Sequence, residues 1–178
     1  MKLILHGIFL LLFTNLHSYT QVNLPDSMAL VGLYNSTGGS NWTNHTNWLV
    51  TNNPVSEWEG VVVSGNRVVA VSLNNNNLIG TISSSIGDLN ALTVLDLSGN
   101  TLSGGIPATI NSLTLLESLN LSSNNFTGTV PSLNNLTNLS FCELYDNSLS
   151  GAVPDFSGNL LLFYLDLSFN ALNGTIAG

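Results

Sequence analysis

The stretch LDLSGNTLSGGIP, residues 95–107, sets leucine, asparagine, glycine and proline at intervals that return along the chain. Aligned on the asparagine, the pattern occurs five times, with spacings of 24, 24, 23 and 23 residues. The five asparagines are Asn76, Asn100, Asn124, Asn147 and Asn170. A period of this length indicates a solenoid, in which each repeat forms one coil that packs on its neighbours.

Each position in the repeat has a physical role. Leu95 and Leu97 fall on one face of a short strand and Asp96 on the other, so the leucines point inward. One coil cannot bury its leucines alone, so stacked coils share a core and pair their strands in parallel. An inward asparagine amide donates and accepts at once, and it can satisfy backbone groups that would cost about 1–3 kcal/mol each if buried unpaired. The repeated asparagines therefore predict a structural ladder at the bends.

The pattern LxxLxLxxNxLxGxIP resembles the plant-type leucine-rich repeat of receptor-kinase ectodomains, polygalacturonase inhibitors and similar exported bacterial proteins. The resemblance covers residues 68–178. It implies an α/β solenoid, a leucine-rich repeat horseshoe with a parallel concave sheet and an N-terminal helical cap. Plant members usually brace the cap with paired cysteines, whereas Cys142 is the only cysteine here, which favours a bacterial relative.

The cap is expected in the stretch that precedes the repeats. DSMALVGLYNSTGGSNW resembles the helix of such caps, and WEGVVV resembles the element that leads into the first strand. Asp26 or Ser27 is expected to cap this helix, because short polar side chains accept from exposed helical N–H groups. The tryptophans of this region are expected to cover the open end of the core.

The chain divides into three segments. Residues 1–20 form an expected signal peptide, with a positive start, an apolar run of eleven residues and a polar exit. A membrane anchor is the alternative, although a spanning helix needs about 20 apolar residues. Residues 21–66 form the cap and 67–178 the five repeats, the last incomplete, so a longer protein is expected. We expect a secreted or cell-surface location and no span after residue 20.

Charge and composition exclude several classes of function. After removal of residues 1–20, Arg67 is the only basic side chain against ten carboxylates, a net charge of about −9. Such a surface repels nucleic acid and anionic lipid. Cys142 takes an inward position and is read as a core residue. His45 is the only histidine after the signal, too few for zinc, and no cofactor is expected.

The outward positions of the strands form the natural contact surface. The first three repeats carry small polar groups there, whereas the last two bring aromatic rings beside carboxylates. The candidate ligand-binding residues are Phe141, Glu143, Tyr145, Asp146, Tyr164, Asp166 and Phe169. Aromatic rings beside carboxylates on a rigid sheet suit a cationic or amphipathic partner or the face of a sugar. Tyr145 and Tyr164 rank first, and variation without a ligand is the alternative.

The sequence therefore predicts an exported, non-catalytic module that recognises a protein or carbohydrate through its concave face. The alternative is a structural or spacer segment of a longer cell-surface receptor or adhesion protein. Glu143 and Asp166 lie on neighbouring strands, about 4.8 Å apart, close to the 5–5.5 Å or so of retaining glycosidases. An open surface does not raise a carboxyl pKa, so no enzyme is expected. Calcium on these two carboxylates and Asp146 is a further alternative.

Overall fold

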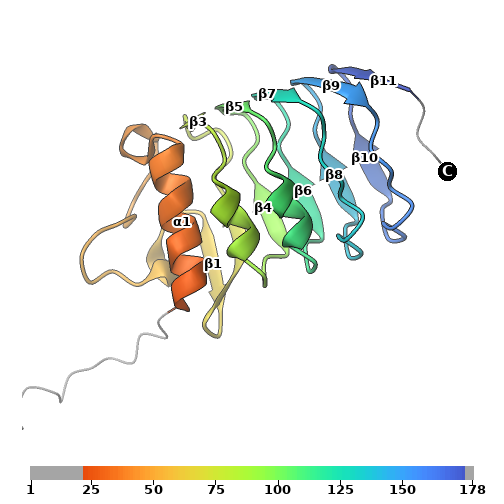
Figure 1. The fold of residues 1–178 in the computed structure, drawn as a ribbon. Helices are drawn as coiled ribbons and strands as arrows, with labels where there is room; N and C mark the ends of the chain where they lie inside the picture. Colours follow the sequence, from red (N-terminus) through yellow and green to blue (C-terminus); the bar gives the residue numbers. More distant parts are fainter. Residues whose placement is uncertain (1–21, 175–178) are drawn as a thin grey trace, which may run out of the picture.

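The computed structural model describes residues 22–174, so the expected signal peptide lies outside the described residues. Two sheets run along the solenoid, with strands side by side in the order of the repeats (Figure 1). The first, here called the concave sheet, contains β1 (Val61–Ser64), β2 (Arg67–Ser72), β4 (Val94–Asp96), β6 (Ser118–Asn120), β8 (Phe141–Glu143) and β10 (Tyr164–Asp166). The second sheet contains β3 (Ile79–Gly80), β5 (Thr101–Gly104), β7 (Asn125–Gly128), β9 (Ser148–Ala152) and β11 (Ala171–Asn173).

Strand pairing follows the repeat period. From β2 onward each strand of the concave sheet pairs in parallel with the equivalent strand of the next repeat, whereas β1 and β2 pair antiparallel. The inward leucines fill the space between the two sheets, and Leu95, Leu97 and Leu102 are fully buried. The predicted α/β solenoid with a parallel concave sheet and an N-terminal helical cap is confirmed.

Short helical turns close the side of the coils away from the concave sheet. The 3-10 helices Ser84–Asp88 and Ala108–Ser112 pack against each other, and α1 (Leu24–Ser36) packs against the first of them, so the three stand in line in Figure 1. Their apolar side chains Ile86 and Ile110 are buried. The cap helix thus continues the row that the repeats form.

The repeated asparagines join each coil to the one before it. Asn124 is typical: its Oδ1 accepts from the backbone N–H of Leu102 at 2.9 Å, and its Nδ2 donates to the carbonyl of Leu97 at 3.0 Å. The same Nδ2 donates within its own coil to the carbonyl of Leu121 at 3.2 Å. Asn76 makes the equivalent link to the cap, since it accepts from the N–H of Asn44 and donates to its carbonyl. Equivalent bonds are made by Asn100, Asn147 and Asn170.

The expected helix cap, Asp26 or Ser27, was wrong by three or four residues. Asn23 is the N-cap, and its side chain accepts from the N–H of Asp26 at 2.9 Å. The helix begins earlier because Pro25 in its first turn already has helical φ and needs no N–H partner. Asp26 is instead fully buried and bonds Arg67 through both carboxylate oxygens, at 3.0 and 3.1 Å.

The tryptophans cover the open end of the core. Trp42, Trp48 and Trp58 are all buried, and Trp48 contacts the other two rings at centroid distances of 4.9 and 4.7 Å. Trp42 donates its indole N–H to the carbonyl of Thr37 at 3.0 Å, which ties the cluster to the end of α1. Across residues 22–174 no helix is both long and apolar enough to cross a membrane.

Candidate binding site on the concave sheet

The outward side chains of the concave sheet lie in columns because the register repeats from coil to coil. One column runs Ala70, Val94, Ser118, Phe141, Tyr164, and the other runs Ser72, Asp96, Asn120, Glu143, Asp166. Each column changes character between the third and fourth repeat, where small side chains give way to aromatic rings and a longer carboxylate. The face is therefore lower over β2, β4 and β6 than over β8.

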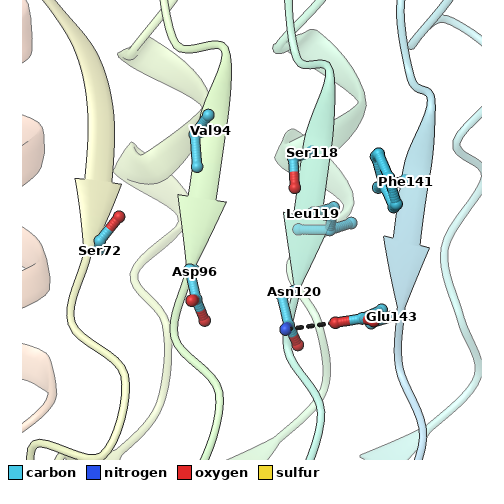
Figure 2. Close-up of a pocket in the computed structure, with 8 residues that line it drawn as sticks. All are labelled: Ser72, Val94, Asp96, Ser118, Leu119, Asn120, Phe141 and Glu143. Atoms are coloured by element: carbon cyan, nitrogen blue, oxygen red, sulfur yellow. Dashed lines mark hydrogen bonds between the residues drawn. The ribbon is translucent and has the colours of Figure 1, made fainter.

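This step in height creates a shallow hollow. Its volume is about 340 Å³, and Figure 2 shows the side chains around it. They are Ser72, Val94, Asp96, Ser118, Leu119, Asn120, Phe141 and Glu143. The Phe141 ring and the Glu143 carboxylate stand on β8 at one side, and Asp96 lies on β4 at the other (Figure 2). The hollow thus offers one aromatic wall and carboxylates on two strands.

A recurring hydrogen-bond motif orients the polar column. Asp96 Oδ1 accepts from the backbone N–H and the hydroxyl of the serine two residues later, Ser98, at 3.0 and 2.6 Å. Asn120 and Asp166 are held in the same way by the serines that follow them. The hydroxyl of Ser168 contributes most to lowering the pKa of Asp166 from its ordinary value, and the backbone N–H of Ser168 contributes next. The carboxylate of Asp166 therefore stays charged at neutral pH.

The fourth repeat departs from this motif. Tyr145 stands where the second, third and fifth repeats have Ser98, Ser122 and Ser168, and Glu143 is one methylene longer than aspartate. Glu143 instead reaches sideways and accepts from Nδ2 of Asn120 on β6 (Figure 2). The carboxylate is thereby held over the hollow.

The candidate residues divide into two groups by their place on the sheet. Phe141 and Tyr164 are neighbours on β8 and β10, with ring centroids 5.8 Å apart and exposures of 39% and 41%. Tyr145, Asp146 and Phe169 lie beyond the strands, outside the lining of the hollow; Asp146 and Phe169 occupy the turn at φ of 55° and 53°. Of the seven candidates, Phe141 and Glu143 line the hollow, Tyr164 and Asp166 lie beside them on β10, and the other three lie at the C-terminal edge of the sheet.

Several residues of the site were not among the candidates. Ser72, Asp96, Ser118 and Asn120 line the hollow, and their small size relative to Phe141 is what creates it. Phe163 was also missed, although its ring packs edge-on against Phe141 at a centroid distance of 4.3 Å. The signal was present in the sequence, since Phe163 takes the position of Ser140 in the preceding repeat.

The electrostatic character of the site is acidic. Arg67 is the only lysine or arginine in residues 22–174, and its guanidinium is paired with Asp26. No basic side chain in the described part of the chain therefore balances Asp96, Glu143 and Asp166 on the concave sheet. A bound group with positive charge would be attracted to this face.

The structure gives little support for metal or thiol chemistry. Within residues 22–174 no three His, Cys, Asp or Glu side chains lie close enough to hold a metal ion, so the suggested calcium set does not form. Cys142 is fully buried, and burial, with a smaller contribution from Glu143, raises the pKa of its thiol to about 12. A thiol with that pKa is unreactive at neutral pH.

Comparisons with known proteins agree with this architecture. A family model described as "Leucine rich repeat" matches residues 66–126, whereas curated proteins give no match. One chain of the BIR3–SERK2 complex from Arabidopsis thaliana is 34% identical, with a TM-score of 0.73 and 85% of each chain covered. The BIR2 ectodomain from the same plant is 32% identical, with a TM-score of 0.77, covering 88% of this chain and 84% of that one.

A third solved structure comes from a protein of a different kind. A plant ice-binding protein is 31% identical, with a TM-score of 0.76, and the match covers 85% of this chain and 50% of that one. The expected bacterial origin stays a prediction. The repeat pattern, the solenoid and the identity to the BIR3–SERK2 and BIR2 structures together show that this chain belongs to the leucine-rich repeat family, in its plant-type form.

Proposed function

We propose that this protein is an exported, non-catalytic binding module that recognises a protein or carbohydrate ligand through its concave sheet. The observation that carries the proposal is the hollow beside Phe141 and Glu143, where an exposed ring adjoins a fixed carboxylate. Export rests on the apolar segment of residues 1–20 and on the similarity to the BIR2 ectodomain. A spacer segment of a larger receptor remains the alternative.

The chemistry of the face favours a ligand with positive charge. A lysine or arginine side chain can contact the face of Phe141 or Tyr164, an attraction of about 0.5–2 kcal/mol, and pair with a neighbouring carboxylate. A protein segment supplies such groups, and the solved relative from the BIR3–SERK2 complex associates with another protein. A sugar can stack on the same rings and bond the same carboxylates.

The absence of catalysis is proposed from the carboxylates themselves. A general acid needs a raised pKa, which burial or a neighbouring charge provides. Asp166 has a lowered pKa and lies on an open face. Glu143 is engaged with Asn120, so the pair lacks the environment of a hydrolase. Incubation with glycan substrates should release no product, and product formation abolished by Glu143→Gln would overturn the proposal.

The direct test is capture of ligands from a glycan array and a library of synthetic peptides. The double variant Phe141→Ser, Tyr164→Ser should bind the captured ligand with an affinity lower by about tenfold or more, since aromatic anchors dominate binding energy. Serine occupies the same column at Ser118, so the fold should tolerate both changes. Ile79→Ser, on the second sheet, is the control. Unchanged affinity in the double variant would refute the concave site.

A second candidate function is binding to ice, which one observation favours. On β5, β7 and β9 the outward residues are uncharged hydroxyls and an amide, repeated about every 4.8 Å across the strands. They are Thr101, Ser103, Asn125, Thr127, Ser148 and Ser150. A solved plant ice-binding protein is 31% identical to this chain. If this face binds ice, Thr127→Lys should abolish inhibition of ice recrystallisation, and a parent protein without such inhibition would exclude the function.

A further inference from the structure

A cluster of exposed apolar side chains lies just before β10, at the edge of the concave sheet. Leu160, Leu161 and Phe163, here called the rim patch, are 87%, 59% and 72% exposed. We propose that the rim patch is a second contact surface, which docks a basic amphipathic segment of a partner protein. This inference goes beyond the concave site, because it needs no ligand in the hollow.

The rim patch faces outward by register, because its positions are also outward in earlier coils. The backbone N–H of Phe163 donates to the carbonyl of Ser140 at 3.1 Å, and that of Ser140 donates to the carbonyl of Glu117 at 2.8 Å. Phe163 therefore continues a column that is polar in the two preceding repeats. Leu160 likewise follows Thr137 of the preceding repeat, which is exposed.

The inward positions of the same coil differ from the rim patch. Leu162 and Leu165 continue the inward positions of Leu139 and Cys142, and both pack against the core. Core packing explains why these inward side chains are apolar. It does not explain the apolar side chains of the rim patch, because the preceding coil has polar residues at the same positions. Large exposed apolar side chains that follow one another closely along the chain are typical of contact surfaces.

The rim patch is continuous with the aromatic part of the concave site. Phe163 packs against Phe141 in an edge-on arrangement at 4.3 Å, and Phe141 also lies beside Tyr164. A partner that covers Leu160 and Leu161 would therefore extend over the edge of the sheet onto the exposed ring of Phe163. Large aromatic and aliphatic anchors of this type carry most of the energy of protein interfaces.

Charge decides which partner fits. Glu117 lies on the same edge as the rim patch, and Glu143 and Asp166 lie on the adjoining strands. Arg67, the only lysine or arginine among residues 22–174, is occupied by Asp26. A second copy of the chain, with the same net charge of −8, would be repelled. A segment that sets lysine or arginine beside large apolar side chains satisfies both features of the surface.

The test uses two synthetic peptides with identical leucine and phenylalanine positions, one carrying lysine and the other glutamate between them. The variant Leu160→Thr, Leu161→Asn, Phe163→Ser installs the side chains of the preceding repeat, Thr137, Asn138 and Ser140, so the coil should keep its fold. The lysine peptide should bind the parent at least about tenfold more tightly than the glutamate peptide. The triple variant should lose about tenfold in affinity for it.

Two controls make the result specific. Ile79→Ser removes an exposed apolar side chain from the second sheet, and it should leave peptide affinity unchanged. Unfolding midpoints of parent and triple variant should agree. Equal affinity for both peptides, or unchanged affinity in the triple variant, would overturn the inference. A parent dimer in sedimentation that the triple variant abolishes would assign the rim patch to a second copy and overturn it also.

Discussion

At the scale of single residues, the asparagine ladder is costly to substitute because its amides satisfy buried backbone groups. Asn124 is buried and satisfies the N–H of Leu102 and the carbonyls of Leu97 and Leu121. Leucine at this position fills the space but leaves these groups without partners, at about 1–3 kcal/mol each. We expect Asn124→Leu to lower the free energy of unfolding by about 3–5 kcal/mol, measured by urea denaturation.

The neighbouring residue supplies the control for this prediction. Asn125 is exposed on β7, and Asn125→Ala should change stability by less than about 0.5 kcal/mol. If both variants unfold at the same urea concentration as the parent, the ladder is not what holds the bends.

Cys142 gives the molecule a predictable response to alkaline pH. Its folded-state pKa is about 12, above the ordinary 9.0, so the folded state keeps a proton that the unfolded chain loses. This contribution to stability is complete below pH 9 and is lost as pH rises from 9 toward 12, by at most about 1.4 kcal/mol per pH unit. The parent should therefore lose more stability than Cys142→Ala between about pH 8 and pH 11. Parallel pH profiles would contradict the burial of the thiol.

At the scale of elements, one ion pair fastens the cap helix to the repeats. Asp26, fully buried in the first turn of α1, bonds the Arg67 guanidinium and the N–H of Val68, both on β2. Because Arg67 is partly exposed, its loss should cost somewhat less than that of a fully buried partner. We expect Arg67→Met to destabilise the protein by about 2–4 kcal/mol in thermal or urea unfolding.

A double variant separates the charge from the packing. Asp26→Asn removes the uncompensated carboxylate that Arg67→Met leaves behind. The double variant should therefore be more stable than Arg67→Met alone. If the loss of unfolding free energy in the double variant equals the sum of the losses in the two single variants, Asp26 and Arg67 do not act as a unit.

Sequence reasoning was most accurate for the strands and asparagines that repeat, and its errors concern single positions such as the N-cap of α1 and the small side chains of the hollow. The columns of outward residues follow from the spacing of the asparagines, because one register serves every coil. The N-cap was misplaced because Asn23, Asp26 and Ser27 are all capping residues, and only the pairing of the buried Asp26 with Arg67 decides among them. The hollow was missed because it depends on the smallness of Ser72 and Ser118 relative to Phe141, a property of three coils together.

At the scale of the whole molecule, a solenoid is stable through contacts between neighbouring coils. The coils with β4, β6 and β8 have neighbours on both sides, and their inward residues Leu95, Leu119 and Cys142 are fully buried or nearly so. In the coil with β10, the equivalent Leu165 is only partly buried. In a protein of these 178 residues, local opening should therefore need less free energy in this coil than in the coils with β4, β6 and β8.

Amide hydrogen exchange measures this gradient directly. In β4, β6 and β8 protection should approach the free energy of global unfolding, whereas in β10 and β11 it should be lower by several kcal/mol, because few buried contacts oppose opening there. The rim patch and Tyr164 belong to this less protected coil, so an anchored partner that docks there should raise protection in β10 and leave β4 unchanged. Uniform protection from β2 to β11 in the free protein would mean that the described coils unfold as one unit. A partner at the rim patch would then have no less protected coil to stabilise.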